Sequence, residues 1–338
     1  MIPFYVLSFL SGFFEIGPLM MTLVSGFTGG ITSPAIVQAL ACVLGYQIGN
    51  LAPHPVELSR PIIITTGLLG AFCFTLAVFP LPYAAVVTVR LLGTAFISAC
   101  IQSARSVTKS GASKMFKRGA RVAGFALGFF CNPVFAAAAA ILAVIFSITA
   151  LRRIPAVKCR IILPRIGCIN AVMIFHQMHY FVYCYAAFII AFELGGRSAA
   201  VLAFVASWIV YVLSPFLYRK VKDLRKAFFF GHFLLVILLA GIYFVPSLPI
   251  KIILYLMTGI GGTTEFCIGG LAKKWNLYNE DTQGFSENIG HVLGVASCLL
   301  LFLLCEDLQT SMLFAAVFAL TAIVCMAKTA ISINKEQL

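Results

Sequence analysis

The chain has 338 residues, of which 61% are hydrophobic and only 10% are charged, and its formal net charge is +13. Soluble domains contain roughly 45–50% apolar and about 25% charged residues, so this composition excludes an ordinary water-soluble fold and indicates an integral membrane protein. Almost all of the 24 lysines and arginines bracket apolar stretches and do not alternate with aromatic residues, so we expect no nucleic-acid partner.

Apolar stretches long enough to cross a bilayer, which takes about 20 residues, follow one another along the chain. They cover residues 4–26, 33–51, 61–79, 82–104, 121–150, 166–193, 199–217, 227–245, 250–271, 287–304 and 309–327. The stretch 121–150 is too long for one span and contains Asn132-Pro133, which disfavours a continuous helix. We predict that it crosses twice, which gives an all-α integral membrane protein with about twelve transmembrane helices.

Lysine and arginine concentrate in alternate gaps between these stretches. Six lie within 105–121, five within 152–165 and five within 219–226. The intervening gaps hold only Arg197 and Lys251. Basic residues near short loops stay on the cytoplasmic side of a membrane. The sequence therefore predicts a multi-pass protein of the plasma membrane (the inner membrane in a bacterium), in contact with the lipid bilayer and with both termini cytoplasmic.

The basic segment 151–165 separates two halves of the chain. We expect an N-terminal six-helix bundle over residues 1–150 and a C-terminal six-helix bundle over 166–338, joined by this cytoplasmic linker. Internal duplication with a substrate site between the repeats is the architecture of many secondary transporters. The 11 cysteines are scattered without a C-x-x-C pair, so we expect neither a disulfide framework nor a zinc motif.

Charged residues at membrane depth are costly and therefore mark functional candidates. Glu15 lies inside the first apolar stretch, where burial would favour its protonated form and allow it to exchange a proton. Alternatively, it forms an ion pair with Arg90 that holds two helices together. Arg90 is always protonated, so it is expected to bind an anionic substrate or to keep Glu15 ionised.

The segment 176–185 is the densest polar and aromatic cluster inside any predicted span. His176, His179, Tyr180 and Tyr183 fall on one helical face. Two imidazoles at this spacing can share a proton, contact a metal or recognise a metal chelate, and the tyrosines can stack on an organic cation or aromatic ring. The alternative is that the histidines are hydrogen-bonded to neighbouring helices and the tyrosines only pack. We expect no tight metal site, because no third ligand is near in sequence.

Three further ionisable residues complete the candidates. Glu265 is either a proton carrier or close enough to the cytoplasmic end of its helix to be hydrated. His291, in the stretch 287–304, is a candidate for the substrate or proton pathway. His232 stands beside a basic loop, and we expect it to be structural. The acidic segment 276–287 is interpreted as a solvated connector.

Four short motifs resemble the major facilitator superfamily. They are Arg90-Leu-Leu-Gly93, Gly124-x3-Gly128-x4-Pro133, the basic run Ser214 to Lys226, and the glycine-rich Tyr255 to Gly262. They are similar, in that order, to the family's fourth-span motif, its fifth-span antiporter motif, the loop motif after its eighth span and its tenth span. The loop 52–60 departs from the family's D-R-x-G-R-R pattern, so we expect a divergent and short member.

This resemblance implies a fold of two six-helix bundles around a central cavity, faced by Arg90 and by the helix that carries His176. It implies a secondary active transporter that moves a small organic solute by alternating access, with protons or another coupling ion. We expect proton-coupled export; uptake of a nutrient by symport, and a transport-incompetent sensor or scaffold, are the alternatives. We expect no enzyme, cofactor or metal, and a monomer.

Overall fold

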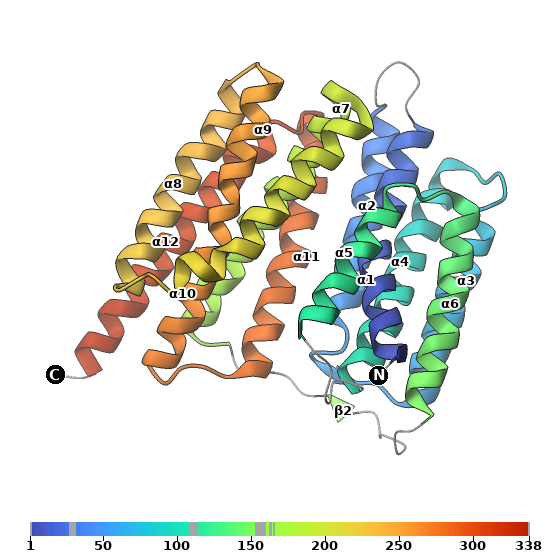
Figure 1. The fold of residues 1–338 in the computed structure, drawn as a ribbon, viewed down its shortest axis with the longest axis horizontal. Helices are drawn as coiled ribbons and strands as arrows, with labels where there is room; N and C mark the ends of the chain where they lie inside the picture. The colour runs from blue at the N-terminus through green and yellow to red at the C-terminus, as the bar shows by residue number, and fades with distance from the viewer. Residues whose placement is uncertain are drawn as a thin grey trace. The chain divides into compact units, whose positions relative to one another are not determined.

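The computed structural model is almost entirely helical (Figure 1). It describes residues 2–26, 32–107, 114–152, 160–161, 164 and 166–336. The chain divides into two compact units, residues 1–163 (unit 1) and residues 164–338 (unit 2).

Unit 1 contains six helices in its described part and one short pair of strands. They are α1 (Ile2–Ser25), α2 (Ser33–Leu51), α3 (Arg60–Leu76), α4 (Tyr83–Val107), α5 (Lys114–Gly128) and α6 (Pro133–Leu151), with β1 (Val56–Glu57) antiparallel to β2 (Arg160–Ile161). The predicted break within 121–150 is present, because α5 ends at Gly128 and α6 begins at Pro133. Of these two helices, only α6 is long and apolar enough to span a bilayer, so the double crossing stays a prediction. The Asn132 Oδ1 accepts a hydrogen bond from the Phe135 amide at 2.9 Å and caps α6.

Two described helices begin well before the predicted position. The fifth helix begins at Lys114, well before the apolar stretch, so the basic residues that follow belong to a helix and not to a loop. The acidic segment 276–287 is not a simple connector, because α11 begins at Glu280. In both cases the helix continues through polar residues beyond the part that hydropathy marks.

Unit 2 contains six helical segments in its described part. The labelled elements are α7 (Cys168–Tyr218), α8 (Leu224–Phe244), α9 (Leu248–Met257), the 3₁₀ turn η1 (Thr258–Ile260), α10 (Gly261–Lys274), α11 (Glu280–Cys305) and α12 (Thr310–Glu336). Gly196 breaks α7 into two helices with a left-handed φ of 68°. The elements α9, η1 and α10 follow one another without a loop and form one interrupted helix, which matches the predicted stretch 250–271.

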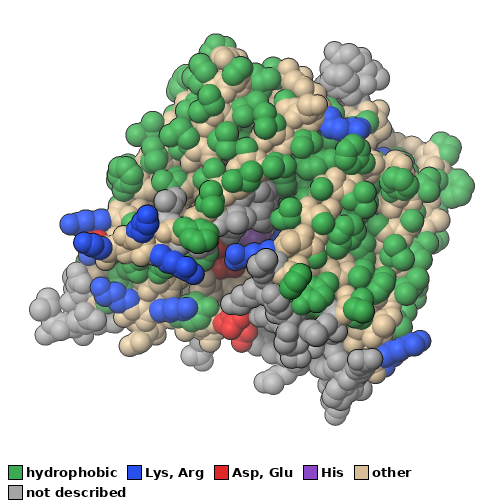
Figure 2. All heavy atoms as spheres, in the orientation of Figure 1, with side chains coloured by type: hydrophobic (Ala, Val, Ile, Leu, Met, Phe, Trp, Pro, Cys, Tyr) green, Lys and Arg blue, Asp and Glu red, His purple; other side chains and the backbone are tan. Residues whose placement is uncertain are grey.

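The surface of the described residues is that of a membrane protein. Within the described ranges, nine helices are long and apolar enough to span a bilayer, and α3 is a shorter apolar helix. Large apolar side chains remain uncovered, for example Phe72, Phe244 and Leu304, which are 59%, 72% and 72% exposed. Figure 2 shows hydrophobic side chains over most of the visible face, with Lys and Arg of unit 2 gathered near the lower ends of α8 and α10. The chain is therefore an integral multi-pass membrane protein.

Helices α1 and α5 pack with their backbones in contact through small residues. A Cβ atom added to Gly124 of α5 would lie 2.8 Å from the Phe13 amide nitrogen of α1, and closer still to the Phe9 carbonyl oxygen. A Cβ atom added to Gly12 of α1 would lie 2.9 Å from the Arg121 carbonyl carbon and closer still to its oxygen. Only glycine allows this approach at either position, as in other small-residue helix contacts within membranes.

The cysteines form no disulfide among the described residues. All ten described cysteines are free; Cys168 and Cys305 are exposed, and the other eight are buried or half-buried. The buried thiols behave as small apolar side chains within the bundles.

Candidate functional site

The close packing of α1 and α5 places an ion pair inside unit 1. Glu15 is 7% exposed, and its Oε2 accepts a hydrogen bond from Arg121 Nη2 at 2.5 Å. The alternative in which Glu15 pairs with Arg90 is therefore wrong for the described residues. Arg121 had been assigned to a basic gap. Arg121 lies one turn before Gly124 on the same face of the helix. That shared face is the sequence feature that could have predicted its contact with α1.

Unit 1 also contains a hydrogen-bonded network in its core. The Tyr46 hydroxyl donates to the Ser11 carbonyl oxygen at 3.0 Å. Gln102 Nε2 donates to Ser11 Oγ at 3.1 Å and to Asn50 Oδ1 at 2.8 Å. Arg105 Nη1 donates to Ser11 Oγ at 3.2 Å and to Gln102 Oε1 at 2.8 Å. This network joins α1, α2 and α4, and it contains a second arginine that sequence reasoning assigned to a loop.

Arg90 is a buried cation whose described partners are neutral. Its side chain comes from the first third of α4 and is 8% exposed. Nη1 donates to Thr22 Oγ1 and to Gln38 Oε1, both at 2.8 Å, and the buried Nε has no hydrogen-bond partner among the described residues. A guanidinium group that is removed from water without a counter-charge is costly. The position is therefore suited to an anion.

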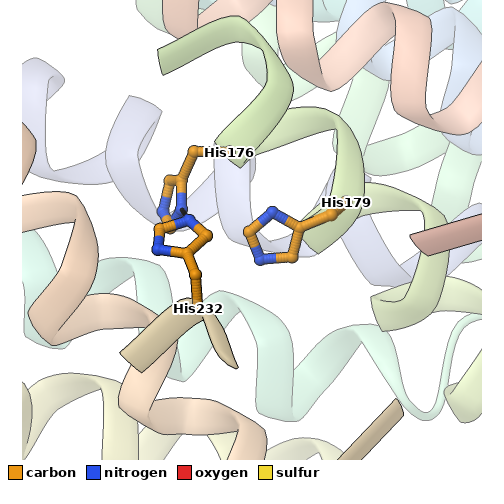
Figure 3. Close-up of side chains that lie close together, drawn as sticks. All are labelled: His176, His179 and His232. Carbon is orange, nitrogen blue, oxygen red and sulfur yellow. Dashed lines mark hydrogen bonds between the residues drawn. The ribbon is translucent and has the colours of Figure 1, made fainter. Parts of the chain in front are cut away.

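Unit 2 brings three histidines together (Figure 3). His176 and His179 come from α7 and His232 comes from α8. One ring nitrogen of each lies within 4.8 Å of the corresponding nitrogens of the other two. The side chains are at most 2% exposed. We call these three residues the histidine cluster. The helical spacing predicted the neighbourhood of His176 and His179, whereas His232 had been expected to be only structural.

Hydrogen bonds to helix carbonyls orient the rings of the cluster. His232 Nδ1 faces the Phe228 carbonyl oxygen at 3.0 Å, and His179 Nδ1 faces the Phe175 carbonyl oxygen at 3.4 Å. A carbonyl oxygen only accepts, so these nitrogens carry the protons and the lone pairs lie on the Nε2 atoms. His232 Nε2 is 3.2 Å from His176 Nδ1. His179 Nε2 is buried and has no partner among the described residues.

The remaining candidates in unit 2 do not all join this cluster. Tyr183 is fully buried, with its ring 6.0 Å from that of His179, and Tyr180 is half-buried with its ring 5.5 Å from that of Tyr183. Glu265 is half-buried in α10.

His291 of α11 lies on a different side of α7 from the cluster. Its ring stacks on Phe181 at 3.9 Å, and its Nε2 is 3.2 Å from Gln177 Oε1. The face predicted from helical spacing is therefore present, but His291 is not part of it.

Lys251 of unit 2 is a buried cation that the sequence placed in an outer gap. It is 6% exposed, and its Nζ donates to Gln309 Oε1 at 2.7 Å. Lys251 also lines a pocket at the end of α9 together with Tyr255 and several apolar residues of α7. This pocket is small and lined mostly by apolar side chains, so we interpret it as a gap in the packing of the bundle.

Comparison with known proteins identifies the fold. No protein-family model matches the chain, and no curated protein matches it. Among solved structures, the human organic anion transporter MFSD10 (TETRAN) is 14% identical, with 96% of this chain and 97% of that chain covered and a TM-score of 0.58. The nucleoside transporter NupG is 15% identical, with 96% and 98% covered and a TM-score of 0.59. The chain therefore has the fold of the major facilitator superfamily.

Proposed function

We propose that this protein is a secondary active transporter that moves a small organic solute across the membrane by alternating access and exports it in exchange for protons. The observation that carries the proposal is the fold, which is shared over 96% of the chain with two proteins that are transporters. A fold alone does not fix a function. The further support is that the few ionisable side chains at membrane depth are buried in groups, and such residues commonly mark substrate and proton pathways.

Arg90 supports a solute with an anionic group. The guanidinium is buried, and its described hydrogen bonds go to the neutral Thr22 and Gln38. A carboxylate or phosphate would supply the missing counter-charge and can accept two parallel hydrogen bonds from a guanidinium. The bound solute would then compensate a charge that the protein itself leaves uncompensated.

The ion pair of Glu15 with Arg121 supports proton coupling. Protonation of Glu15 removes its negative charge and therefore its attraction for Arg121, so the contact between α1 and α5 that contains the pair depends on the protonation state. A two-state transporter needs a group of this kind, because a proton shifts the equilibrium only as far as it binds one state better than the other. Glu265 and the histidine cluster are the other groups in the spanning helices able to take part, with Tyr180, Tyr183 and His291 as candidate contacts of the solute pathway.

Transport in proteoliposomes with a pH-sensitive dye inside tests the proposal. A panel of carboxylate, phosphate, neutral and cationic solutes is added outside. In exchange, entry of solute expels protons and the lumen becomes alkaline, whereas symport acidifies it. We expect anionic solutes to give the alkaline response, Arg90→Gln to abolish it, and Glu15→Gln to separate solute movement from proton movement.

The exposed Glu193 supplies a matched control. Glu193→Gln removes one carboxylate from the same protein and should leave the flux unchanged. Solute-dependent flux that survives in both Arg90→Gln and Glu15→Gln would contradict the roles given to these residues. Binding of a solute to folded protein without any flux would contradict transport and favour a membrane sensor.

A further inference from the structure

We propose that the histidine cluster, His176, His179 and His232, binds one divalent transition-metal ion of the Zn²⁺ class. The sequence led us to expect no tight metal site, because the two histidines of α7 lack a third ligand nearby. The fold supplies that ligand from α8, 56 residues from His176. The inference concerns unit 2 alone and does not depend on whether the protein transports a solute.

The spacing of the three donors fits a single ion. Zinc binds imidazole nitrogen at about 2.0–2.1 Å with tetrahedral geometry, which places two such nitrogens about 3.4 Å apart. His176 Nδ1 and His232 Nε2 are already 3.2 Å apart. One ring nitrogen of each histidine lies within 4.8 Å of those of the other two. Bringing the farthest pair from 4.8 Å to about 3.4 Å closes the site around one ion and takes a shift of at most about 1.4 Å.

For two of the three histidines, the second ring nitrogen is arranged as a metal site requires. A histidine that binds a metal usually donates its other N–H to a carbonyl or carboxylate, which fixes the tautomer and aims the lone pair. His232 does this through Phe228 at 3.0 Å and His179 through Phe175 at 3.4 Å. Both contacts use the carbonyl one helical turn earlier, so the helices themselves set the orientation.

The buried Nε2 of His179 is the atom whose surroundings indicate that a ligand is missing. It has no hydrogen-bond partner among the described residues, although the side chain is fully buried. Buried polar atoms without a partner are rare in folded proteins and require an explanation. A hydrogen-bonded pair accounts for His176 and His232, but it leaves His179 Nε2 without an acceptor or donor. A metal ion accounts for all three nitrogens at once.

The donor set also selects the kind of ion. Three neutral imidazoles suit Zn²⁺, Cu²⁺, Ni²⁺ or Co²⁺, whereas Mg²⁺ and Ca²⁺ require oxygen ligands. Among the described residues, no cysteine or acidic residue joins the cluster. The ion would therefore keep its full charge in an apolar environment unless its fourth ligand is anionic. Hydroxide from a bound water, or an anionic group of a bound solute, would lower that charge.

Metal content of the full-length protein, purified without a polyhistidine tag, tests the site. The protein is stripped with a chelator, reloaded with Zn²⁺, freed of excess metal by gel filtration and analysed by mass spectrometry of the metal. We expect one Zn²⁺ per chain. His179→Gln and His232→Gln should each weaken binding by at least about 10-fold, since even changes beyond the direct ligands have effects of this size.

His291→Gln is the matched control, because it removes an imidazole of the same unit that lies outside the cluster. It should keep one Zn²⁺ per chain. Reloading the wild type with Co²⁺ adds a readout that needs no variant, since its visible absorption reports tetrahedral nitrogen coordination. X-ray absorption should give metal–nitrogen distances of about 2.0–2.1 Å.

Two results would overturn the proposal. One is folded wild-type protein that retains no stoichiometric Zn²⁺, Co²⁺, Ni²⁺ or Cu²⁺ after reloading. The other is equal metal content in the wild type, His179→Gln, His232→Gln and His291→Gln. If a cluster variant fails to fold, the metal content and the Co²⁺ spectrum of the wild type still decide the question.

Discussion

Replacing Gly124 with alanine tests the contact that places Arg121 beside Glu15. The new Cβ would lie 2.8 Å from the Phe13 amide nitrogen, whereas ordinary contact begins at 3.4 Å, so this atom alone forces α1 and α5 apart by at least 0.6 Å. The Phe9 carbonyl oxygen lies closer still to the new Cβ, so it requires a larger separation of the two helices. Overpacking of this kind costs about 1–3 kcal/mol of unfolding free energy. The movement also lengthens the ion pair between Arg121 and Glu15, which is 2.5 Å in the native protein.

Gly119→Ala is the matched control on the same helix. Nothing lies within 4 Å of a Cβ atom at Gly119. Both variants gain the same helix propensity, about 0.8–1 kcal/mol, so the difference between them isolates the clash. Unfolding in mixed detergent micelles, followed by circular dichroism, should show Gly119→Ala at or above wild-type stability and Gly124→Ala below it. Equal stability of the two variants would refute the backbone contact between α1 and α5.

Three further substitutions probe local features by the same unfolding measurement. Gly196→Ala should cost about 1–3 kcal/mol, because φ is 68° and ψ is −164° there, a backbone region that only glycine adopts readily, although the space is open; unchanged stability would contradict backbone strain. Asn132→Ala should cost about 1 kcal/mol by removing the cap on the Phe135 amide, and Asn132→Ser should restore most of it if capping is the reason. Tyr46→Phe should cost about 1 kcal/mol through the lost bond to Ser11, and a neutral result would mean that this hydrogen bond does not contribute to stability.

Hydropathy predicted the helices of this fold well, but not where they end. The predicted span 33–51 coincides with α2, and Asn132-Pro133 correctly marked the break before α6. Both signals are local: one is the length of an apolar run, and the other is a residue that cannot continue a helix. The polar starts of α5 and α11 were missed because a helix continues wherever its backbone hydrogen bonds continue, inside the lipid or beyond it.

In the candidate sites, too, local sequence patterns did not predict which helices are in contact. Helical periodicity was enough to place His176 and His179 on one face. It gave no reason to bring His232 to them, or Arg121 to Glu15, because those partners are 56 and 106 residues apart. Such pairs depend on which helices pack together and at what height, and small residues such as Gly124 decide that. The long-range partner is therefore the part of each site that a local pattern cannot supply.

Among the described residues, two thiols are exposed, Cys168 and Cys305, and they can report the orientation of the native chain in the membrane. Cys168 is the first residue of α7 and Cys305 is the last residue of α11. The predicted orientation assigns the start of α7 to the cytoplasm and the end of α11 to the opposite face. A maleimide that cannot cross membranes should therefore modify Cys305 from outside intact cells and reach Cys168 only after the membrane is opened. Peptide mapping of the modified cysteines would then measure the orientation without any engineered residue.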